Sequence, residues 1–232
     1  MKVEIWSDIL CPWCYIGKRR FEAALAAFPH REDVEVVWRS FELDPSAPRS
    51  HEGDPTDRLA AKYRISRQDA LDAQHRMSSV AADEGLDFHL VTARSGNSFD
   101  AHRLVHLAAE VDRQDQMKER LFAAYLLEGR PIGDPDTLAA LAEEVGIDRQ
   151  RATDVLAGDG YGEAVRADEA EATAFGISGV PFFVIDRTYG ISGAQPVDTL
   201  TAALNQAWEK SQLVVVPSGD EPGACEGDSC VV

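Results

Sequence analysis

The sequence predicts an α/β fold in which one long all-helical segment interrupts a small unit of strands and helices. Three observations predict it. Residues 2 to 43 read as strand, helix and strand, residues 55 to 176 keep a helical pattern without a convincing strand, and residues 181 to 210 read as a strand hairpin followed by a helix. The segments before and after the helical stretch are expected to form one discontinuous unit.

The first unit is built around the motif Cys11-Pro12-Trp13-Cys14. Residues 2 to 7 alternate as in a strand, and the motif follows almost at once. From residue 14 to 28 apolar side chains recur at helical spacing, so the cysteines open a helix. Val, Trp and Phe in residues 34 to 43 predict a second strand, which ends at the Asp44-Pro45 breaker.

Capping residues divide the helical segment. Asp134-Pro135 is typical of an N-cap with proline at the first helical position, Gly146 of a helix end, and Asp148 of the next N-cap. The pattern predicts a compact layer of helices.

After Gly176 the pattern returns to strands. The apolar run from 181 to 185 predicts a strand, residues 187 to 190 a turn, and residues 191 and 192 the start of a return strand. Residues 196 to 210 predict a final amphipathic helix that begins at a proline.

This order predicts three parts. Residues 1–50 and 177–212 form a discontinuous α/β domain, and residues 51–176 form a helical insertion domain. Residues 213–232 are rich in Gly, Pro, Ser and acidic side chains, which predicts a flexible C-terminal tail with a second cysteine pair.

Composition and charge disfavour several classes of partner. The chain of 232 residues has 40 acidic and 23 basic side chains, a formal charge of -17, and a field of that sign repels nucleic acids and anionic membrane surfaces. Charges interrupt the N-terminal apolar positions, so no signal-peptide core is recognised, and no run approaches the roughly 20 apolar residues of a membrane helix. We therefore expect a soluble cytoplasmic protein.

The four cysteines fall into two close pairs, Cys11 with Cys14 and Cys225 with Cys230. In a cytoplasmic chain such pairs indicate redox or metal chemistry rather than structural disulfides. A zinc site needs about four ligands, and nothing near Cys11 in the sequence supplies the others. Redox chemistry is therefore predicted, and no metal site.

The spacing of Cys11 and Cys14 suits disulfide exchange. Two cysteines three positions apart in a first helical turn lie on one face and close a disulfide after modest adjustment. Cys11, at the positive end of the helix, is predicted to attack as a thiolate, and Cys14, against the core, to resolve the mixed disulfide. Pro12 fits a position whose N–H would be unpaired, and Trp13 adds an exposed apolar surface.

Three longer motifs occur in order: Asp8-Ile9-Leu10-Cys11-Pro12-Trp13-Cys14-Tyr15-Ile16-Gly17, Asn97-Ser98-Phe99-Asp100-Ala101-His102-Arg103 and Gly176-Ile177-Ser178-Gly179-Val180-Pro181-Phe182-Phe183. Together they resemble the DsbA-like family of thioredoxin-fold oxidoreductases and, within it, the cytoplasmic FrnE-like branch. The similarity spans residues 1 to about 210. It implies a thioredoxin-like fold with a large all-helical insertion.

The resemblance also implies details of the site. It implies a cis peptide bond between Val180 and Pro181 beside Cys11, where backbone groups of Val180 can pair with an extended substrate strand. Familiar periplasmic members carry histidine where this chain has Trp13, so we expect a less oxidising couple here. No bound cofactor is implied, because the cysteine pair itself carries the electrons; glutathione or a thioredoxin-type reductant would serve as co-substrate.

Other polar residues in these motifs have ordinary interpretations beside functional ones. Asp8 could relay a proton, although an Asp just before a helix is more often a cap. Asn97 and His102 belong to the motif that the resemblance places near the active-site cleft, but a helical histidine is usually structural. The basic run Lys18-Arg19-Arg20 is expected on a solvated helix face.

The tail pair, Cys225 and Cys230, allows three interpretations: an electron relay to the first pair, half of a metal site completed by another chain, or an idle tail. The acidic neighbours Glu226 and Asp228 raise a thiol pKa and so disfavour a fast nucleophile. We favour an auxiliary redox pair.

The sequence thus predicts a thiol-disulfide oxidoreductase acting on protein disulfides, with small-molecule disulfides as a further substrate class and with reductase or isomerase character. One alternative is a glutathione-dependent enzyme like 2-hydroxychromene-2-carboxylate isomerases or kappa-class glutathione transferases, which typically carry serine at the nucleophile position. Another is a non-catalytic holdase using Trp13. Both cysteines of the first pair are present, which favours the oxidoreductase. The sequence leaves open the physiological substrate, the direction of electron flow and the oligomeric state.

Overall fold

The computed structural model describes residues 1–211 and the backbone of residues 225–226 and 229–230. At its centre lies a four-stranded mixed sheet with the strand order β2-β1-β3-β4. The strands are β1 (Lys2–Ser7), β2 (Glu35–Ser40), β3 (Phe182–Ile185) and β4 (Tyr189–Ser192). β1 pairs in parallel with β2 and antiparallel with β3, so segments from before and after the helical stretch share one sheet, as the sequence predicts.

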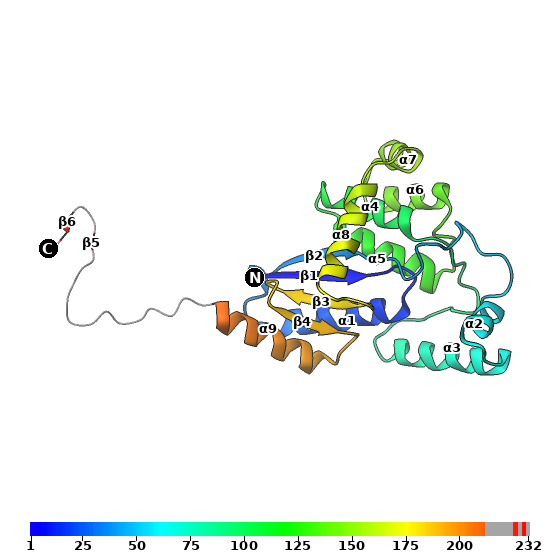
Figure 1. The fold of residues 1–232 in the computed structure, drawn as a ribbon, viewed down its shortest axis with the longest axis horizontal. Helices are drawn as coiled ribbons and strands as arrows, with labels where there is room; N and C mark the ends of the chain where they lie inside the picture. The colour runs from blue at the N-terminus through cyan, green and yellow to red at the C-terminus, as the bar shows by residue number, and fades with distance from the viewer. Residues whose placement is uncertain (212–224, 227–228, 231–232) are drawn as a thin grey trace.

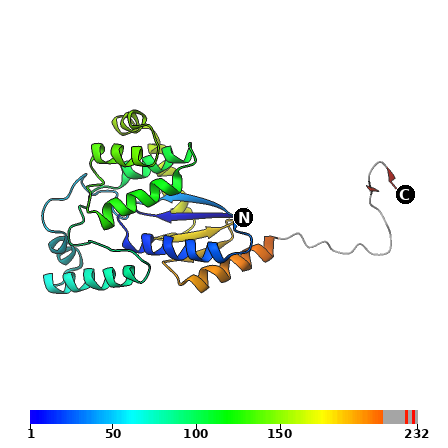
Figure 2. The same cartoon turned by 180° about the vertical axis from the view of Figure 1, so that it is seen from behind.

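Helices pack on both faces of this sheet (Figures 1 and 2). α1 (Pro12–Ala27) and α9 (Val197–Ser211) lie together on one face, and α8 (Gly162–Ala174) covers part of the other. The other helices are α2 (Pro55–Tyr63), α3 (Arg67–Ala82), α4 (Phe99–Ala109), α5 (Gln114–Phe122), α6 (Pro135–Glu144) and α7 (Arg149–Ala157), with a 3₁₀ turn at Arg31–Asp33 and a π-helical turn at Ala123–Leu127.

Alternation along the strands divides the core between the two faces. Val3 and Ile5 of β1 contribute to the larger apolar cluster, together with Phe183 of β3 and residues of α1 and α9. Trp6 belongs to a second cluster, with Ala172 of α8. The larger cluster continues into helices α4 to α7, so the sheet and the helical insertion share one core.

The helix limits follow the capping residues that the sequence indicates. Asp134 caps α6 by accepting the N–H of Thr137 at 2.9 Å, and Asp148 caps α7 by accepting the N–H of Arg151 at 2.8 Å. Gly146, just beyond α6, has a φ of 87°, a conformation that residues with a Cβ rarely adopt. All three predictions are confirmed.

The second strand is shorter than predicted and ends at Ser40 rather than near Leu43. Beyond Ser40, carboxylates from other elements accept the backbone N–H groups. Glu169 of α8 accepts the N–H of Glu42 at 3.2 Å, and Asp8 accepts the N–H of Leu43 at 2.8 Å. Side chains thus satisfy donors that a longer strand would have used in the sheet.

The hairpin between β3 and β4 turns earlier than predicted. The loop comprises residues 186–188, so Tyr189 and Gly190, which the sequence places in the turn, already belong to β4. Asp186 and Arg187 adopt positive φ values of 46° and 55°. Turns with positive φ values usually contain Gly or Asn. Neither residue occurs at positions 186–188, so the sequence does not mark where the turn lies.

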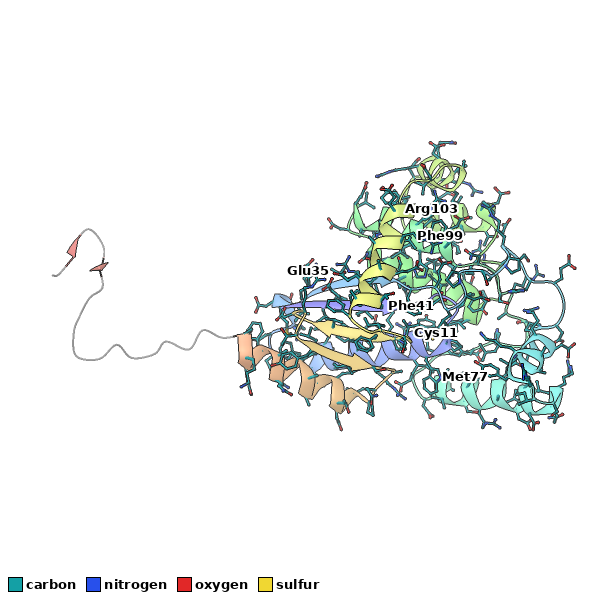
Figure 3. All side chains as sticks on the ribbon, in the orientation of Figure 1. Cys11, Glu35, Phe41, Met77, Phe99 and Arg103 are labelled. Carbon is teal, nitrogen blue, oxygen red and sulfur yellow. The ribbon has the colours of Figure 1, made fainter. Side chains whose placement is uncertain are left out.

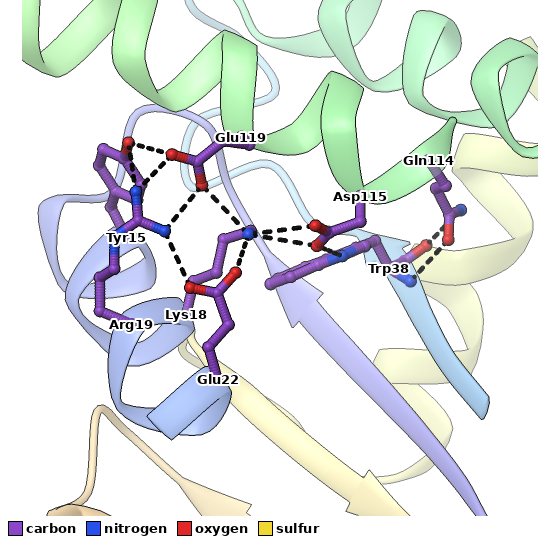
Figure 4. A network of polar contacts seen from close by, with 8 residues as sticks. All are labelled: Tyr15, Lys18, Arg19, Glu22, Trp38, Gln114, Asp115 and Glu119. Atoms are coloured by element: carbon purple, nitrogen blue, oxygen red, sulfur yellow. Dashed lines mark hydrogen bonds and ion pairs between the residues drawn. The ribbon is translucent and has the colours of Figure 1, made fainter. Parts of the chain in front are cut away.

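A polar network joins α1 to α5 (Figure 4). Lys18, predicted on a solvated face, is instead buried, with 1% of its side chain exposed. Its Nζ lies 3.2 Å from Asp115 and 3.1 Å from Glu119 of α5, and it also pairs with Glu22 of α1. The prediction for Lys18 is wrong because the acidic face of α5 lies opposite, and no local pattern in α1 reveals that neighbour.

Glu119 is the centre of this network. The hydroxyl of Tyr15 donates to its carboxylate at 2.6 Å, and Arg19 pairs with the same group. Burial would raise the pKa of Glu119, but the hydrogen bonds from Arg19 and Tyr15 and the charge of Lys18 hold it below its usual range. An ionised Glu119 therefore fixes the helix that carries the cysteine motif against the helical insertion.

The outer edge of β2 is covered by side chains. Gln114, at the start of α5, accepts the backbone N–H of Trp38 at 3.0 Å and donates to its carbonyl at 3.1 Å (Figure 4). Two residues further along the same edge, Asp168 accepts the N–H of Ser40 at 2.8 Å. The amide of Gln114 thereby takes the place of a neighbouring strand at Trp38.

Of the predicted tail, only β5 (Cys225–Glu226) and β6 (Ser229–Cys230) are described. Their backbones pair antiparallel, with Cys225 opposite Cys230. The rest of the predicted tail, and the side chains of both cysteines, lie outside the described residues.

The network predicts acid lability that depends on Glu119. Because its pKa is lower in the folded than in the unfolded chain, Glu119 contributes stability above the ordinary glutamate pKa of about 4.3 and loses it as the pH falls through the lower folded value. Glu119→Gln should reduce the free energy of unfolding by about 2 kcal/mol at neutral pH, and by less in acid, in urea denaturation at several pH values.

The matched control is Glu32→Gln, which removes an exposed carboxylate whose ion-pair partner among the described residues is the neighbouring Arg31. It should change the free energy of unfolding by less than about 0.5 kcal/mol. A Glu119→Gln loss that stays constant from neutral to acid pH would contradict the prediction.

Candidate active site

The cysteine motif lies where β1 ends and α1 begins. Cys11 is the N-cap residue of α1, and Pro12 occupies the first helical position. The N–H of Cys11 donates to the carbonyl of Asp8 at 3.1 Å, and the N–H of Cys14 to the carbonyl of Cys11 at 3.0 Å. These bonds form the turn that leads the chain out of the strand and into the helix.

Both thiols are free and buried, with 5% of Cys11 and 1% of Cys14 exposed. Trp13, between them, is 41% exposed, so the predicted apolar surface is present beside the thiols. Burial raises the pKa of the Cys14 thiol well above its usual value, and the adjacent Cys11 raises it further. Cys14 therefore rests as a protonated thiol, a state that suits a resolving cysteine.

The loop before β3 reaches the thiol of Cys11. The Val180-Pro181 peptide bond is cis, and the thiol of Cys11 donates to the carbonyl oxygen of Val180 at 3.6 Å. The first and third sequence motifs, separated by the whole helical insertion, therefore meet at this sulfur.

Gly17 makes this approach possible. It lies on the buried face of α1, and a Cβ built on it would fall 2.8 Å from Cγ of Pro181. Because the proline ring is fixed to its backbone, no side-chain rotation could relieve that contact. The glycine at the end of the first motif is thus explained by the proline of the third.

Asp8 is fully buried directly after β1. Its carboxylate accepts the N–H groups of Leu10 at 3.2 Å and Leu43 at 2.8 Å, and Oδ1 lies 3.6 Å from Nε2 of His102. Burial would raise the pKa of Asp8, but His102 and the N–H of Leu43 hold it below the usual range. Asp8 is a turn former, as its position before the helix suggests, and it also brings an ionised carboxylate next to the cysteine turn.

The insertion motif places His102 at Asp8. His102 is fully buried on α4, and neither ring nitrogen has a hydrogen-bond partner among the described residues. Burial and the cation of Lys118 lower the pKa of His102, so its imidazole is neutral. The structure thus brings Asp8 and His102 together.

The other polar residues of that motif serve the scaffold. Asn97, two residues before α4 begins, accepts the N–H of Phe99 at 2.8 Å, and its amide donates to the carbonyl of Pro45 at 3.3 Å. Arg103 donates at 2.7 Å to each of the carbonyls of Gly158 and Gly160, beyond the end of α7. Figure 3 shows Arg103 and Phe99 within the helical layer, well away from Cys11.

One buried charged residue at the end of β1 is not predicted from the sequence. Lys118 of α5 is fully buried, and its Nζ donates to the carbonyl of Ser7 at 3.2 Å, at the end of β1. The sequence does contain a sign that Lys118 is buried, because Lys118 shares a helical face with the apolar Leu121, Phe122 and Tyr125. A charged residue inside an apolar stripe is a candidate for a special role.

The cavity beside the insertion motif is a separate feature. It has a volume of about 400 Å³ and is lined by Arg49, Asn97, Asp100 and Arg103 among others. Cys11 is not among its lining residues, so this cavity does not surround the thiols.

Two features are absent from the part of the chain that the structure describes. No cluster of three or more His, Cys, Asp or Glu side chains within it could hold a metal ion. No helix within it is both long enough and apolar enough to cross a membrane.

Known proteins show the same organisation. The profile of the DSBA-like thioredoxin domain matches residues 2–205. The crystal structure of a probable DsbA oxidoreductase from Streptomyces coelicolor is 44% identical, covers 100% of this chain and 99% of its own, and superposes with a TM-score of 0.88. An uncharacterized protein of Bacillus subtilis, YwbO, is 31% identical over 90% of this chain and 98% of its own.

A more distant structure shares the fold. The cytosolic disulfide reductase DsbM from Pseudomonas aeruginosa is 20% identical, covers 91% of this chain and 100% of its own, and has a TM-score of 0.61. It has also been solved with GSH.

The contact between Gly17 and Pro181 predicts an unusual response to a helix-favouring substitution. In a helix interior alanine is about 1 kcal/mol more favourable than glycine, yet Gly17→Ala should lower the free energy of unfolding by about 1–3 kcal/mol, because the added methyl group displaces the Pro181 loop. Urea denaturation measures the change.

Gly162→Ala in α8 is the control, since its Cβ would lie 3.4 Å from the ring of Phe99, an ordinary contact. That variant should keep wild-type stability. Equal stability of the Gly17→Ala protein would show that the close approach imposes no constraint.

Proposed function

The chain belongs to the DSBA-like thioredoxin domain family, as its motifs predict, and on that premise we propose that it is a thiol-disulfide oxidoreductase acting through Cys11 and Cys14. One observation carries the proposal. Cys11 lies at the N-terminus of α1 with the free thiol of Cys14 one turn further in, and the Val180-Pro181 loop lies against its sulfur.

The positions of the two thiols support a division of labour. Cys11 is at the positive end of the helix dipole, where a thiolate is stabilised, whereas burial keeps Cys14 protonated. Cys11 is therefore the residue that attacks a substrate disulfide, forming a mixed disulfide and releasing one substrate thiolate. Cys14 then loses its proton and attacks the sulfur of Cys11, which closes the Cys11-Cys14 disulfide and releases the second substrate thiolate.

The surroundings of Cys11 suit an extended polypeptide substrate. The Val180-Pro181 segment brings backbone polar groups to the thiol, and the exposed Trp13 and Leu43 offer apolar surface. Backbone pairing gives affinity without sequence preference, and apolar surface favours unfolded segments over the polar exteriors of folded proteins. Protein disulfides in extended segments are the proposed main substrates.

The proposed direction is reduction or isomerisation in a cytoplasmic setting. Trp13 carries no charge that would stabilise the Cys11 thiolate, and a couple that oxidises weakly suits a reducing compartment. Glutathione or a thioredoxin-type protein is proposed to return the Cys11-Cys14 disulfide to the dithiol; the related DsbM solved with GSH is in line with a glutathione partner. The presence of both thiols disfavours the glutathione-dependent isomerase and transferase alternative.

The mechanism predicts different outcomes for the two cysteines. Cys11→Ser should reduce insulin reduction by dithiothreitol to the uncatalysed rate, because the attacking thiolate is lost. Cys14→Ser should instead trap Cys11-linked mixed disulfides, visible by mass spectrometry after acid quenching. Catalysis at the wild-type rate by Cys11→Ser would refute the proposal.

The pair Cys225 and Cys230 is proposed to be auxiliary. Removing the chain after Lys210, or replacing both tail cysteines by serine, should leave insulin reduction by dithiothreitol within about twofold of wild type, since the small dithiol recycles the first pair directly. Loss of turnover in the double serine variant would assign the tail pair an obligatory part.

A further inference from the structure

Arg20 connects the helix that carries the thiols to two other segments of the chain. It lies on α1, and 20% of its side chain is exposed. Its Nε donates to the carboxylate of Glu84, just beyond the end of α3, at 2.6 Å. Its Nη1 donates to the backbone carbonyl of Ala194 at 2.7 Å. Ala194 belongs to residues 193–196, the turn between β4 and α9, so a single side chain joins α1 to this β4–α9 turn and to the end of α3.

The β4–α9 turn contacts the loop beside Cys11. We name this loop, residues 177–181, the docking loop, because the proposed function places the substrate against its backbone. The N–H of Gly193 donates to the carbonyl of Pro181 at 2.8 Å, and the carbonyl of Val180 accepts the thiol of Cys11 at 3.6 Å. Two hydrogen bonds in succession, from Arg20 to the turn and from the turn to the docking loop, therefore connect α1 with the backbone at the thiol.

The same segments pack together one turn away on α1. A Cβ built on Gly17 would lie 2.8 Å from Cγ of Pro181 and 3.5 Å from Cβ of Ala194. Gly17 and Arg20 are three residues apart, so they share a face of the helix. The glycine allows the docking loop and the turn to approach α1. The guanidinium then holds the turn there through a hydrogen bond from a charged donor, which is stronger than one between neutral groups.

The neighbouring Arg19 has a different set of partners. Its recorded hydrogen bonds go to Tyr15 and Glu22 of α1 and to Glu119 of α5. Its side chain is 30% exposed, close to the value for Arg20. None of these recorded partners belongs to the docking loop or to the β4–α9 turn. The two adjacent arginines thus allow a contact between helices to be separated from a contact with the loop.

We propose that Arg20 is a positioning residue for polypeptide substrates. By holding the β4–α9 turn against α1, it fixes the docking loop beside Cys11, where backbone groups of Val180 pair with an extended chain. The inference rests on the proposed function and deepens it, because it names the residue that aligns the substrate-binding backbone with the attacking thiol. Arg20 acts through the loop rather than on the thiol.

The proposal separates two classes of disulfide. A polypeptide substrate needs both the thiol of Cys11 and the backbone of the docking loop, whereas a small aromatic disulfide has no backbone to pair and needs only the thiol. A binding segment that is already held in place costs less to order when the substrate associates. Release of the loop should therefore weaken the binding of polypeptides and leave the chemistry at Cys11 unchanged.

Two reagents with the same leaving group provide the test. One is the symmetric disulfide of thionitrobenzoate, and the other is an extended peptide whose single cysteine carries thionitrobenzoate in a mixed disulfide. With either reagent, Cys11 forms a bond to one sulfur, and the coloured thionitrobenzoate thiolate leaves with the electron pair of the broken bond. All proteins are reduced and carry serine in place of Cys225 and Cys230, so that the thiols of the first pair alone react.

The rate of the first release is measured against peptide concentration, with the peptide in excess. For Arg20→Met the half-saturating peptide concentration should rise about fivefold, because one lost hydrogen bond changes an equilibrium by between about twofold and about tenfold. The limiting rate with the peptide and the rate with the small disulfide should both stay within about twofold of the parent protein, as expected when only binding is lost.

Two matched variants serve as controls. Arg19→Met removes the neighbouring arginine, and Glu84→Gln removes the ion pair at the end of α3 but leaves the hydrogen bond from Arg20 to Ala194. Both should keep the half-saturating peptide concentration within about twofold of the parent protein, since pairs near the surface contribute little. A rise in either variant as large as that in Arg20→Met would overturn the proposal. An unchanged concentration in folded Arg20→Met would overturn it as well.

The small disulfide distinguishes the remaining outcomes. If Arg20→Met slows its reaction by the same factor as that of the peptide, the effect lies at the thiol and the proposal is wrong. If the parent protein releases thiolate from neither reagent, the proposed function itself is refuted, whatever Arg20 does.

A second measurement reports on the loop without turnover. The N–H of Gly193 should exchange slowly with deuterium, because it is bonded to the carbonyl of Pro181. Its exchange, followed by nuclear magnetic resonance, should be about fivefold faster in Arg20→Met, since the turn is released from α1, and unchanged in Arg19→Met. Unchanged protection of Gly193 in Arg20→Met would contradict the inference.

Discussion

The buried carboxylate of Asp8 holds together the elements that surround the thiols. It accepts backbone N–H groups from the segment before α1 and from the segment after β2, and it faces His102 of α4. The backbone carbonyl of Asp8 also accepts the N–H of Cys11. A charge without access to water needs hydrogen-bond donors or opposite charges nearby. The positions of Leu10, Leu43 and His102 relative to Asp8 are therefore constrained together. The geometry of the cysteine turn depends on that constraint.

The helical insertion contributes to the site as well as to the fold. Its helix α5 fixes α1 from outside through Glu119 and reaches the end of β1 from inside through Lys118. The shared apolar core makes these contacts rigid, because neither face of α5 can move without disturbing packed side chains. Loss of α5 would therefore change the environment of Cys14, although the motif itself lies far away in the sequence.

Local patterns predicted the class of fold, the cysteine motif at a strand end, and the caps Asp134 and Asp148, because each depends on residues close together in the chain. The misplaced turn between β3 and β4 has a local cause, because the turn lacks the Gly or Asn that usually marks such a turn. Two other failures arise from partners distant in sequence. β2 stops early because Asp8 and Glu169 accept N–H groups beyond it, and Lys18 is buried because α5 lies opposite. Lys118 could have been noticed as a charge within an apolar stripe, but its contact with the carbonyl of Ser7 at the end of β1 required the tertiary structure.

The amide of Gln114 covers the edge of β2 at Trp38, which matters for a protein proposed to bind unfolded polypeptides. An exposed strand edge presents free backbone N–H and carbonyl groups. An extended polypeptide substrate could pair with them at a place that no thiol reaches. The side-chain amide of Gln114 forms hydrogen bonds with the N–H and the carbonyl of Trp38, so these groups are not free to pair with another chain. Extended chains, the proposed substrates, would therefore find no free backbone N–H or carbonyl of Trp38 with which to pair.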